Sequence, residues 1–222
     1  MQRTAVLAIL CVAAVLAAGC GTSPPSRFYT LNATATSTAS PSTLFVAVGP
    51  VTVPAVVDRP EFVVSTGPNE LRIDDFNRWA SPLQDALARA VAENLVAILG
   101  TPRVILFPQP LATDPEYRVA IEVRTFESVP GKTAVIDAVW TIRRAKDGKT
   151  QTGRTSAREK VTDSGYESLA AAHSRAVARL SQDIADATLV LHRGAPEAGC
   201  AAAAGGPASR LPIRKGRRPS CA

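Results

Sequence analysis

The sequence predicts an α+β fold, in which an antiparallel-rich mixed sheet carries two long helices packed on one face within a single domain. Several segments alternate apolar and polar residues, two longer segments place apolar residues at helical spacing, and turn residues separate neighbouring strands. Packing both helices on one face of the sheet is the simplest arrangement that buries their apolar sides. We assign this domain to residues 44–192.

The first part of the domain is predicted to contain strands. Residues 44–54 are rich in β-branched side chains, interrupted by a Gly-Pro pair. Residues 61–66 and 70–73 flank the tripeptide Gly-Pro-Asn, which favours a hairpin. Residues 76–80 then read as a connection to the first helix.

The first helix is predicted to start at Ser81, with Pro82 in its first position and Gln84 completing a capping box. Gly100 ends it and Pro102 prevents its continuation. One face of this helix is apolar, with Leu83, Leu87, Val91, Leu95 and Ile98 at helical spacing.

The second part of the domain is predicted to contain a short strand at residues 103–107 and then three longer strands. The first two of the longer strands, near residues 117–126 and 134–142, each have one apolar row. Residues 150–161 are polar, which indicates a strand at the sheet edge. The apolar rows are Tyr117, Val119, Ile121 and Val123, and Ala134, Ile136, Ala138, Trp140 and Ile142.

A long helix is predicted at the end of the domain. Ser164 and Glu167 are spaced as a second capping box. Its apolar stripe is rich in alanine, which predicts close packing against the sheet. The larger members of the stripe are Leu169, Val177, Leu180, Ile184 and Leu191.

Residues 1–19 are predicted to be a lipoprotein signal peptide. An apolar run at residues 5–16 follows Arg3, and small residues lead into Cys20. The run is too short to span a membrane. This end resembles the lipobox of bacterial lipoproteins, which implies that Cys20 carries acyl chains such as palmitate. An ordinary cleaved signal that happens to precede a cysteine is the alternative.

The segments that flank the domain have different compositions. Residues 20–43 are rich in Ser, Thr, Ala and Pro and are expected to form a lipidated flexible tether. Within it, residues 27–31 form an apolar island that could add a short edge strand to the domain. Residues 193–222 are expected to be a disordered basic tail, which contains Cys200 and Cys221.

The charge distribution gives no support for nucleic-acid binding. The whole chain has a net charge of +6, but Arg3 belongs to the signal and the tail contributes +5. The domain is therefore neutral overall, and no basic stripe of the kind that binds nucleic acid is expected.

Motifs for catalysis, metal binding or cofactor binding are absent from the sequence. His173 lies in the last helix, where a packed histidine is a better interpretation than a catalytic base. Asp74 and Asp75 are expected to face water or to bond to nearby backbone N–H groups. The basic run at residues 143–146 is expected to be a solvated loop, with contact to lipid headgroups or an acidic partner as the alternative. We therefore expect no enzyme activity, no metal and no cofactor.

Phe76, Arg78 and Trp79 stand out because large aromatic and basic residues occupy an expected connection. One interpretation is that Trp79 packs on the first turns of the following helix as a hydrophobic staple. The other is that the three residues bind a partner, because Trp and Arg are enriched in interface hot spots.

Three segments, residues 27–31, 48–64 and 69–101, together resemble the PqiC-type family of ABC-transport auxiliary lipoproteins. The resemblance implies a non-enzymatic role in a lipid-transport system, beside a PqiB-like periplasmic protein with MCE domains. It also implies anchoring at the periplasmic face of the outer membrane, which Gly21 after the cysteine favours over the inner membrane. The family has no catalytic residues to transfer.

Three functions follow as hypotheses. The first is a docking component of an MCE/ABC-type lipid-transport system. The second is a periplasmic lipid-binding carrier, which requires an apolar cavity between the helices and the sheet. The third is an enzyme that acts on envelope material, against which the missing motifs argue. The sequence leaves open whether the protein is a homo-oligomer.

Overall fold

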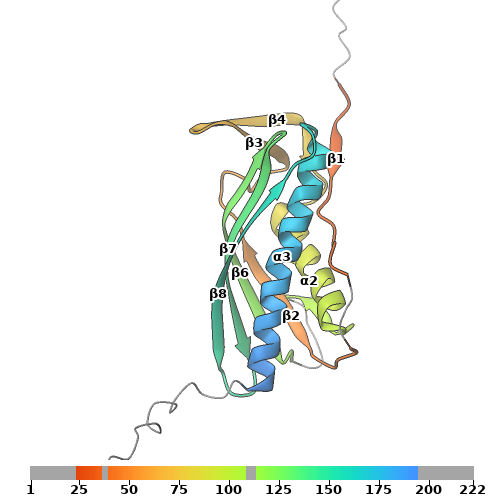
Figure 1. Ribbon diagram of the computed structural model, residues 1–222, viewed down its shortest axis with the longest axis vertical. Coiled ribbons are helices and arrows are strands. Elements are labelled where there is room, and N and C mark those ends of the chain that lie inside the picture. Colours follow the sequence, from red (N-terminus) through yellow and green to blue (C-terminus); the bar gives the residue numbers. More distant parts are fainter. Residues whose placement is uncertain (1–23, 37–39, 109–113, 195–222) are drawn as a thin grey trace, which may run out of the picture.

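The structure is a computed structural model that describes residues 24–36, 40–108 and 114–194. These residues form a single domain with two helices and two sheets (Figure 1). The predicted α+β class is confirmed. The strands, however, divide between two sheets where the sequence pattern predicted one.

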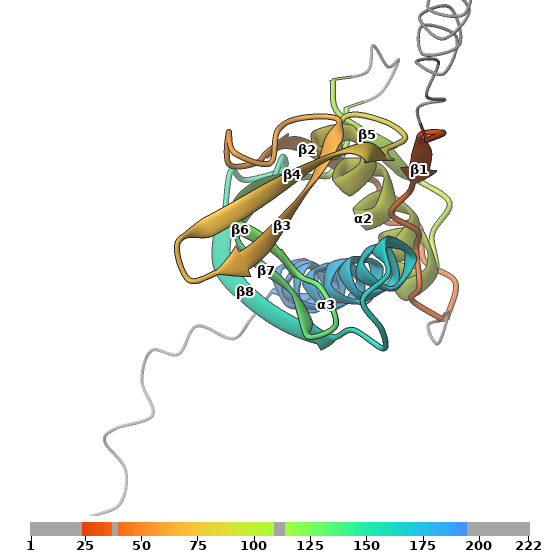
Figure 2. The ribbon, with the colours of Figure 1, turned by 90° about the horizontal axis from the view of Figure 1, so that it is seen from above.

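The larger sheet has five strands and carries both helices on one face. Its strand β2 pairs in parallel with β5 and β6, whereas β6, β7 and β8 form an antiparallel meander. Helix α2 packs on β2 and β5, and α3 packs on β7 and β8. Seen along the long axis, the sheet curves around α3 (Figure 2). The strands in order are β5 (Val104–Leu106), β2 (Val46–Thr52), β6 (Tyr117–Val129), β7 (Thr133–Arg144) and β8 (Thr150–Lys160), and the helices are α2 (Leu83–Leu99) and α3 (Tyr166–Arg193).

The smaller sheet has three strands in the order β1 (Arg27–Tyr29), β4 (Glu70–Trp79) and β3 (Glu61–Gly67). The predicted hairpin is present as β3 and β4. The connection predicted at residues 76–80 is instead largely strand, because β1 pairs in parallel with the end of β4. That pairing joins residues about fifty positions apart, which a local pattern cannot show. This sheet lies at one end of the molecule (Figures 1 and 2).

The capping box predicted for α2 is wrong. The helix begins after Pro82, and no side chain caps it. The Gln84 amide donates to the Asp58 carboxylate at 3.0 Å, which draws Gln84 away from Ser81. A contact distant in sequence therefore replaces the local one.

The capping box predicted for α3 is also wrong, since the residue before the helix is Gly165 and not Ser164. Asp163 supplies the carboxylate at this end. It accepts the Gly165 N–H at 2.7 Å and the Ser168 hydroxyl at 2.6 Å. These hydrogen bonds hold the pKa of Asp163 below its usual value.

The predicted apolar rows of β6 and β7 are confirmed as the inner face of the larger sheet. Every side chain in the two rows is at most 6% exposed. Strand β8 lies at the edge of the sheet, as its polar composition predicts. The buried side chains of both helices and both sheets form one continuous apolar cluster.

Aromatic side chains join the two sheets. Trp79, at the end of β4, stacks on Phe62 of β3 with ring centroids 4.3 Å apart. It also meets Phe126 of β6 edge to face at 6.0 Å. Trp79 is only 4% exposed. The last residue of the smaller sheet is therefore a central part of the common core.

His173 of α3 completes this aromatic cluster, as the packed interpretation predicts. Its ring stacks on Phe126 at a centroid distance of 3.8 Å, and it is fully buried. Nε2 lies 2.8 Å from the Ser128 hydroxyl, and Nδ1 has no hydrogen-bond partner among the described residues. Burial lowers the pKa of His173 to about 3, so the ring is neutral at physiological pH.

We predict that Trp79→Ala destabilises the fold strongly, because the cavity would lie where the two sheets meet. Truncation of a buried tryptophan costs about 3–5 kcal/mol. Phe76→Ala in the same strand removes a side chain that is 40% exposed, and should change stability by under about 1 kcal/mol. Thermal unfolding followed by circular dichroism measures both. Equal melting temperatures for the two variants would contradict this assignment of Trp79.

We also predict a pH-dependent contribution of His173 to stability. Because its pKa is lower in the folded chain than in the unfolded chain, the contribution is complete above about pH 6.5 and is lost as the pH falls toward 3. Denaturant unfolding at pH 7 and pH 5 should show a loss of stability in the wild type that His173→Gln lacks. The same pH dependence in both proteins would show that His173 is not its cause.

Candidate docking surface

Cys20, the predicted lipidation site, lies outside the described residues. Its acylation therefore stays a prediction. Strand β1 begins at Arg27, only seven positions after it. None of the helices in the described ranges is long and apolar enough to cross a bilayer.

The structure separates the three residues predicted to bind a partner. Phe76 is 40% exposed, whereas Trp79 belongs to the core. The Arg78 guanidinium is half-buried and pairs with the Glu61 carboxylate at 2.6 Å. Because side chains alternate along a strand, Phe76 and Arg78 share the face of β4 opposite Trp79. Partner binding at Phe76 and Arg78 stays a prediction, and Trp79 supports that face from behind.

That face, which we call the outer face of the three-stranded sheet, is unusually apolar. Phe28 of β1 lies in register with Arg78 and is 63% exposed. Leu71 and Ile73 of β4 lie opposite Ser65 and Val63 of β3 and are 51% and 45% exposed. A register shift in β4 between Asp74 and Arg78 interrupts the alternation, so Leu71 and Ile73 lie on the same side as Arg78, the partner of Glu61. With Phe76 and the nearby Val56, the outer face holds five of the eight exposed large hydrophobic side chains of the described residues.

Sequence reasoning found only Phe76 and Arg78 of this surface. A signal for two others was present, since Leu71 and Ile73 alternate with Arg72 in the strand. Such alternation normally marks a buried row, and here the row faces outward. Phe28 could not be assigned because its place depends on the parallel pairing of β1 with β4.

A small pocket lies beside the outer face, between the β3–β4 hairpin, the loop after β2, and β6. Its volume is about 230 Å³, and Val56, Val63 and Leu71 line its apolar side. The Ser65 hydroxyl donates to the Glu127 carboxylate at 3.1 Å and ties the hairpin to β6. Sites for drug-sized ligands have about 300–1,000 Å³, so this pocket suits a side chain or a short segment better than a whole lipid.

Of the two acidic residues before Phe76, Asp74 has a structural role. Asp74 accepts the N–H groups of Phe76 and Asn77 at 3.1 and 2.9 Å, as the backbone-bonding interpretation predicts. It also accepts the Tyr166 hydroxyl at 2.7 Å. Burial raises the pKa of Asp74, but these hydrogen bonds outweigh burial and the pKa lies below its usual value. Asp74 thus shapes the chain that presents Phe76.

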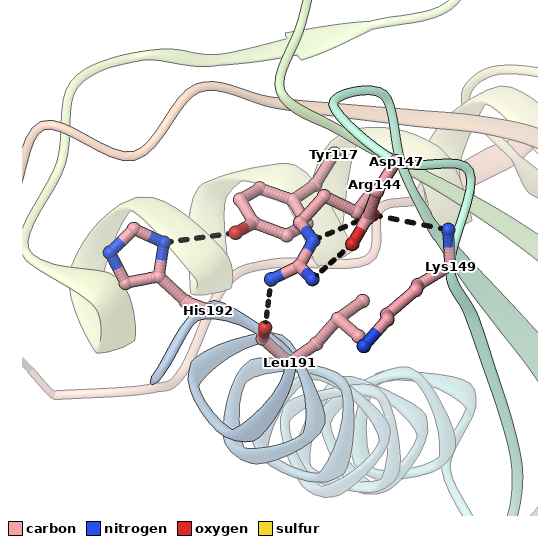
Figure 3. A network of polar contacts seen from close by, with 6 residues as sticks. All are labelled: Tyr117, Arg144, Asp147, Lys149, Leu191 and His192. Atoms are coloured by element: carbon pink, nitrogen blue, oxygen red, sulfur yellow. Dashed lines mark hydrogen bonds and ion pairs between the residues drawn. The ribbon is translucent and has the colours of Figure 1, made fainter. Parts of the chain in front are cut away.

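The opposite end of the molecule carries a polar network (Figure 3). Arg144 donates two hydrogen bonds to Asp147, at 2.9 and 2.5 Å, and a third to the carbonyl of Leu191 near the end of α3. The Tyr117 hydroxyl lies 2.9 Å from His192 Nδ1. The hydrogen bond from Arg144 holds the pKa of Asp147 at about 2.

Residues 143–146 were predicted to form a solvated loop, and this prediction is wrong for Arg144. The Arg144 side chain is only 15% exposed, because it closes the C-terminal end of α3. A cation at this position also interacts favourably with the negative end of the helix dipole. Arg144 therefore has a structural role within the domain.

Within the described ranges, no group of three or more His, Cys, Asp or Glu residues could hold a metal ion. The outer face could bind a partner by burying apolar side chains around one ion pair. Large exposed apolar patches mark sites of protein or membrane contact, which makes this face the candidate docking surface.

Comparison with solved structures supports the fold. An uncharacterized protein matches with a TM-score of 0.61 and 22% identity, covering 74% of this chain and 99% of its own. A DUF330-family protein from Xanthomonas campestris matches with a TM-score of 0.61 and 21% identity, covering 75% of this chain and 97% of its own. At such identities the likeness shows a shared fold. A comparison with curated proteins finds no match.

Comparison with protein families identifies the chain more directly. The family described as the ABC-type transport auxiliary lipoprotein component matches residues 29–185. The match runs from the last residue of β1 into the last third of α3, and so includes most of both sheets and the outer face apart from Phe28. Because it covers well over half of the sequence, the chain belongs to the family of ABC-type transport auxiliary lipoproteins, as the resemblance of its N-terminal half predicted.

Proposed function

We propose that this protein is a periplasmic lipoprotein, anchored at the outer membrane through Cys20, that acts as a docking component of an MCE/ABC-type lipid-transport system. The family membership carries the proposal, because an auxiliary component of a transporter works by association with other subunits. The role requires no catalysis. The inner membrane is the alternative location, and a PqiB-like protein with MCE domains is the proposed partner.

The outer face of the three-stranded sheet is the surface we propose for docking. Phe76 and Phe28 supply exposed aromatic area, which contributes strongly to interfaces because it is large and rigid. Arg78 stands among them already paired with Glu61, so its charge need not be desolvated alone on binding. A partner with a complementary apolar surface fits this face better than a strongly charged one.

The carrier hypothesis receives less support from the geometry. It requires an apolar cavity between the helices and the sheet, and buried side chains from both layers fill that space as one cluster. The pocket of about 230 Å³ lies outside this core, beside the hairpin. Native mass spectrometry that detects a retained lipid would favour the carrier.

Acylation of Cys20 is the first prediction of this proposal. Intact-mass analysis of the protein extracted from membranes should show cleavage before Cys20 and the added mass of acyl chains. Cys20→Ser should remove the added acyl mass, because a serine hydroxyl lacks the thiol that carries the lipid chains. An unmodified Cys20 in membrane-derived protein would contradict the anchor.

Partner contact at Phe76 is the second prediction. A photo-crosslinking amino acid at position 76 should capture the MCE-domain protein in cells that express the transport system. Val190, which is 47% exposed near the end of α3, provides a matched position from which no crosslink is expected. Equal capture at both positions, or none at 76, would count against the outer face as the docking surface.

Substitution of Phe76 should also weaken the contact with the partner. Phe76→Asp places a charge in the apolar surface and should reduce co-purification of the partner under gentle extraction about tenfold or more, as at a hot spot. Its melting temperature should stay close to that of the wild type, because Phe76 lies outside the core. Unchanged co-purification would place the interface elsewhere.

A further inference from the structure

The segment that follows β1 lies against the helices, although its composition predicts a flexible tether. The N–H of Asn32 donates to the Ser174 hydroxyl of α3 at 3.1 Å. The N–H groups of Thr34 and Ala35 both donate to Asn94 Oδ1 of α2, at 3.0 and 2.9 Å. We call residues 27–36 the strap, because they run from the three-stranded sheet along the two helices (Figure 1).

Asn94 is an unusual residue for its place. It belongs to the buried side of α2, between the apolar Val91 and Leu95, and is itself fully buried. Its Oδ1 accepts both strap N–H groups, whereas its Nδ2 has no partner among the described residues. A polar side chain with one unpaired buried atom is costly. The bonds to the strap are the compensation that the structure shows.

Side-chain packing holds the strap at its other end. Leu31 is 7% exposed and belongs to the continuous core. The Tyr29 hydroxyl donates to the Asn77 side chain at 2.8 Å, and its ring meets Phe62 edge to face at 5.8 Å. The strap is therefore secured by backbone pairing, by burial, and by two polar side chains that come from different helices.

This attachment limits the free chain between the proposed anchor and the domain. Only residues 21–26 separate Cys20 from the first residue of β1. Seven Cα-to-Cα steps reach at most about 25 Å when fully extended. By contrast, the 28 residues of α3 span about 42 Å along the long axis of the molecule (Figure 1). The anchor can stay close to the end with β1, and the far end of α3 lies beyond its reach.

We propose that the strap fixes the orientation of the domain on a lipid surface, with the three-stranded sheet near the bilayer and the C-terminal end of α3 away from it. The inference rests on the proposed acylation of Cys20. The outer face is then presented close to the headgroups, where a partner must approach the membrane to contact it. A flexible tether over all of residues 20–43 would instead let the domain rotate freely.

Energy transfer to the bilayer tests this orientation with the full mature protein. A donor dye is attached at Phe28→Cys or at Val190→Cys, in a background with Cys200→Ser and Cys221→Ser. The acylated protein is inserted into phosphatidylcholine vesicles whose headgroups carry an acceptor dye. We expect strong transfer from position 28 and a clear loss of transfer at position 190. Equal transfer from both positions would overturn the proposal.

Substitutions that remove the strap contacts test whether the strap causes this orientation. Asn94→Ala combined with Ser174→Ala should shrink the difference in transfer between the two positions. Ser181→Ala is the matched control, because its hydroxyl bonds to a carbonyl one turn earlier in α3, as Ser174 does, but the hydroxyl makes no bond to the strap. A double variant that retains the wild-type difference would assign orientation to something other than these bonds.

Two further measurements separate the possible failures. Circular dichroism shows whether the double variant still folds, and if it does not, the comparison of positions 28 and 190 in the otherwise wild-type chain still decides the orientation. Intact mass shows whether Cys20 is acylated. Missing acyl chains refute the proposed anchor, whereas acylated protein with equal transfer from both ends refutes the strap as an orienting element.

Discussion

The contact of Trp79 with Phe62 and Phe126 is the interaction on which the rest of the structure depends. It joins the smaller sheet to the larger one, since its members come from β4, β3 and β6. Aromatic pairs contribute beyond the area they bury, through the geometry of their rings. Because Trp79 points inward, alternation along β4 turns Phe76 and Arg78 outward. The buried contact thus determines how the end of β4 presents Phe76 and Arg78 to the outer face.

Much of the fold could be predicted because it depends on local pattern. The alternating rows of β6 and β7, the β3–β4 hairpin and the two helices all follow from residues close together in the sequence. The division into two sheets could not be predicted, because β2 pairs with the distant β5 and β6 and not with the hairpin that follows it in the sequence. The capping box of α2 failed for a similar reason, since Asp58 binds Gln84 from a distant turn. The capping box of α3 failed locally, because Asp163 bonds to Gly165 and Ser168 at this helix start. Phe28 was missed as part of the surface because its neighbours are also distant.

Buried polar residues show most clearly what a local pattern omits. Asn94 and His173 each interrupt an apolar helix face, which a periodicity argument treats as noise. Each has a partner from far along the chain, the strap for Asn94 and Ser128 for His173. Buried polar groups are rarely left without partners, so each marks a contact that the sequence alone does not locate.

The two ends of the molecule differ in the kind of side chain that they expose. At the end of α3, Arg144 is already bonded to Asp147 and to a helix carbonyl, so its charge is satisfied within the domain. At the other end, Phe28, Leu71 and Ile73 expose apolar area that has no partner within the described chain. Burial of such area is favourable at about 25 cal/mol per Å². The end from which β1 leads back toward Cys20 is therefore an end that gains free energy from contact, which agrees with the anchor proposed at Cys20.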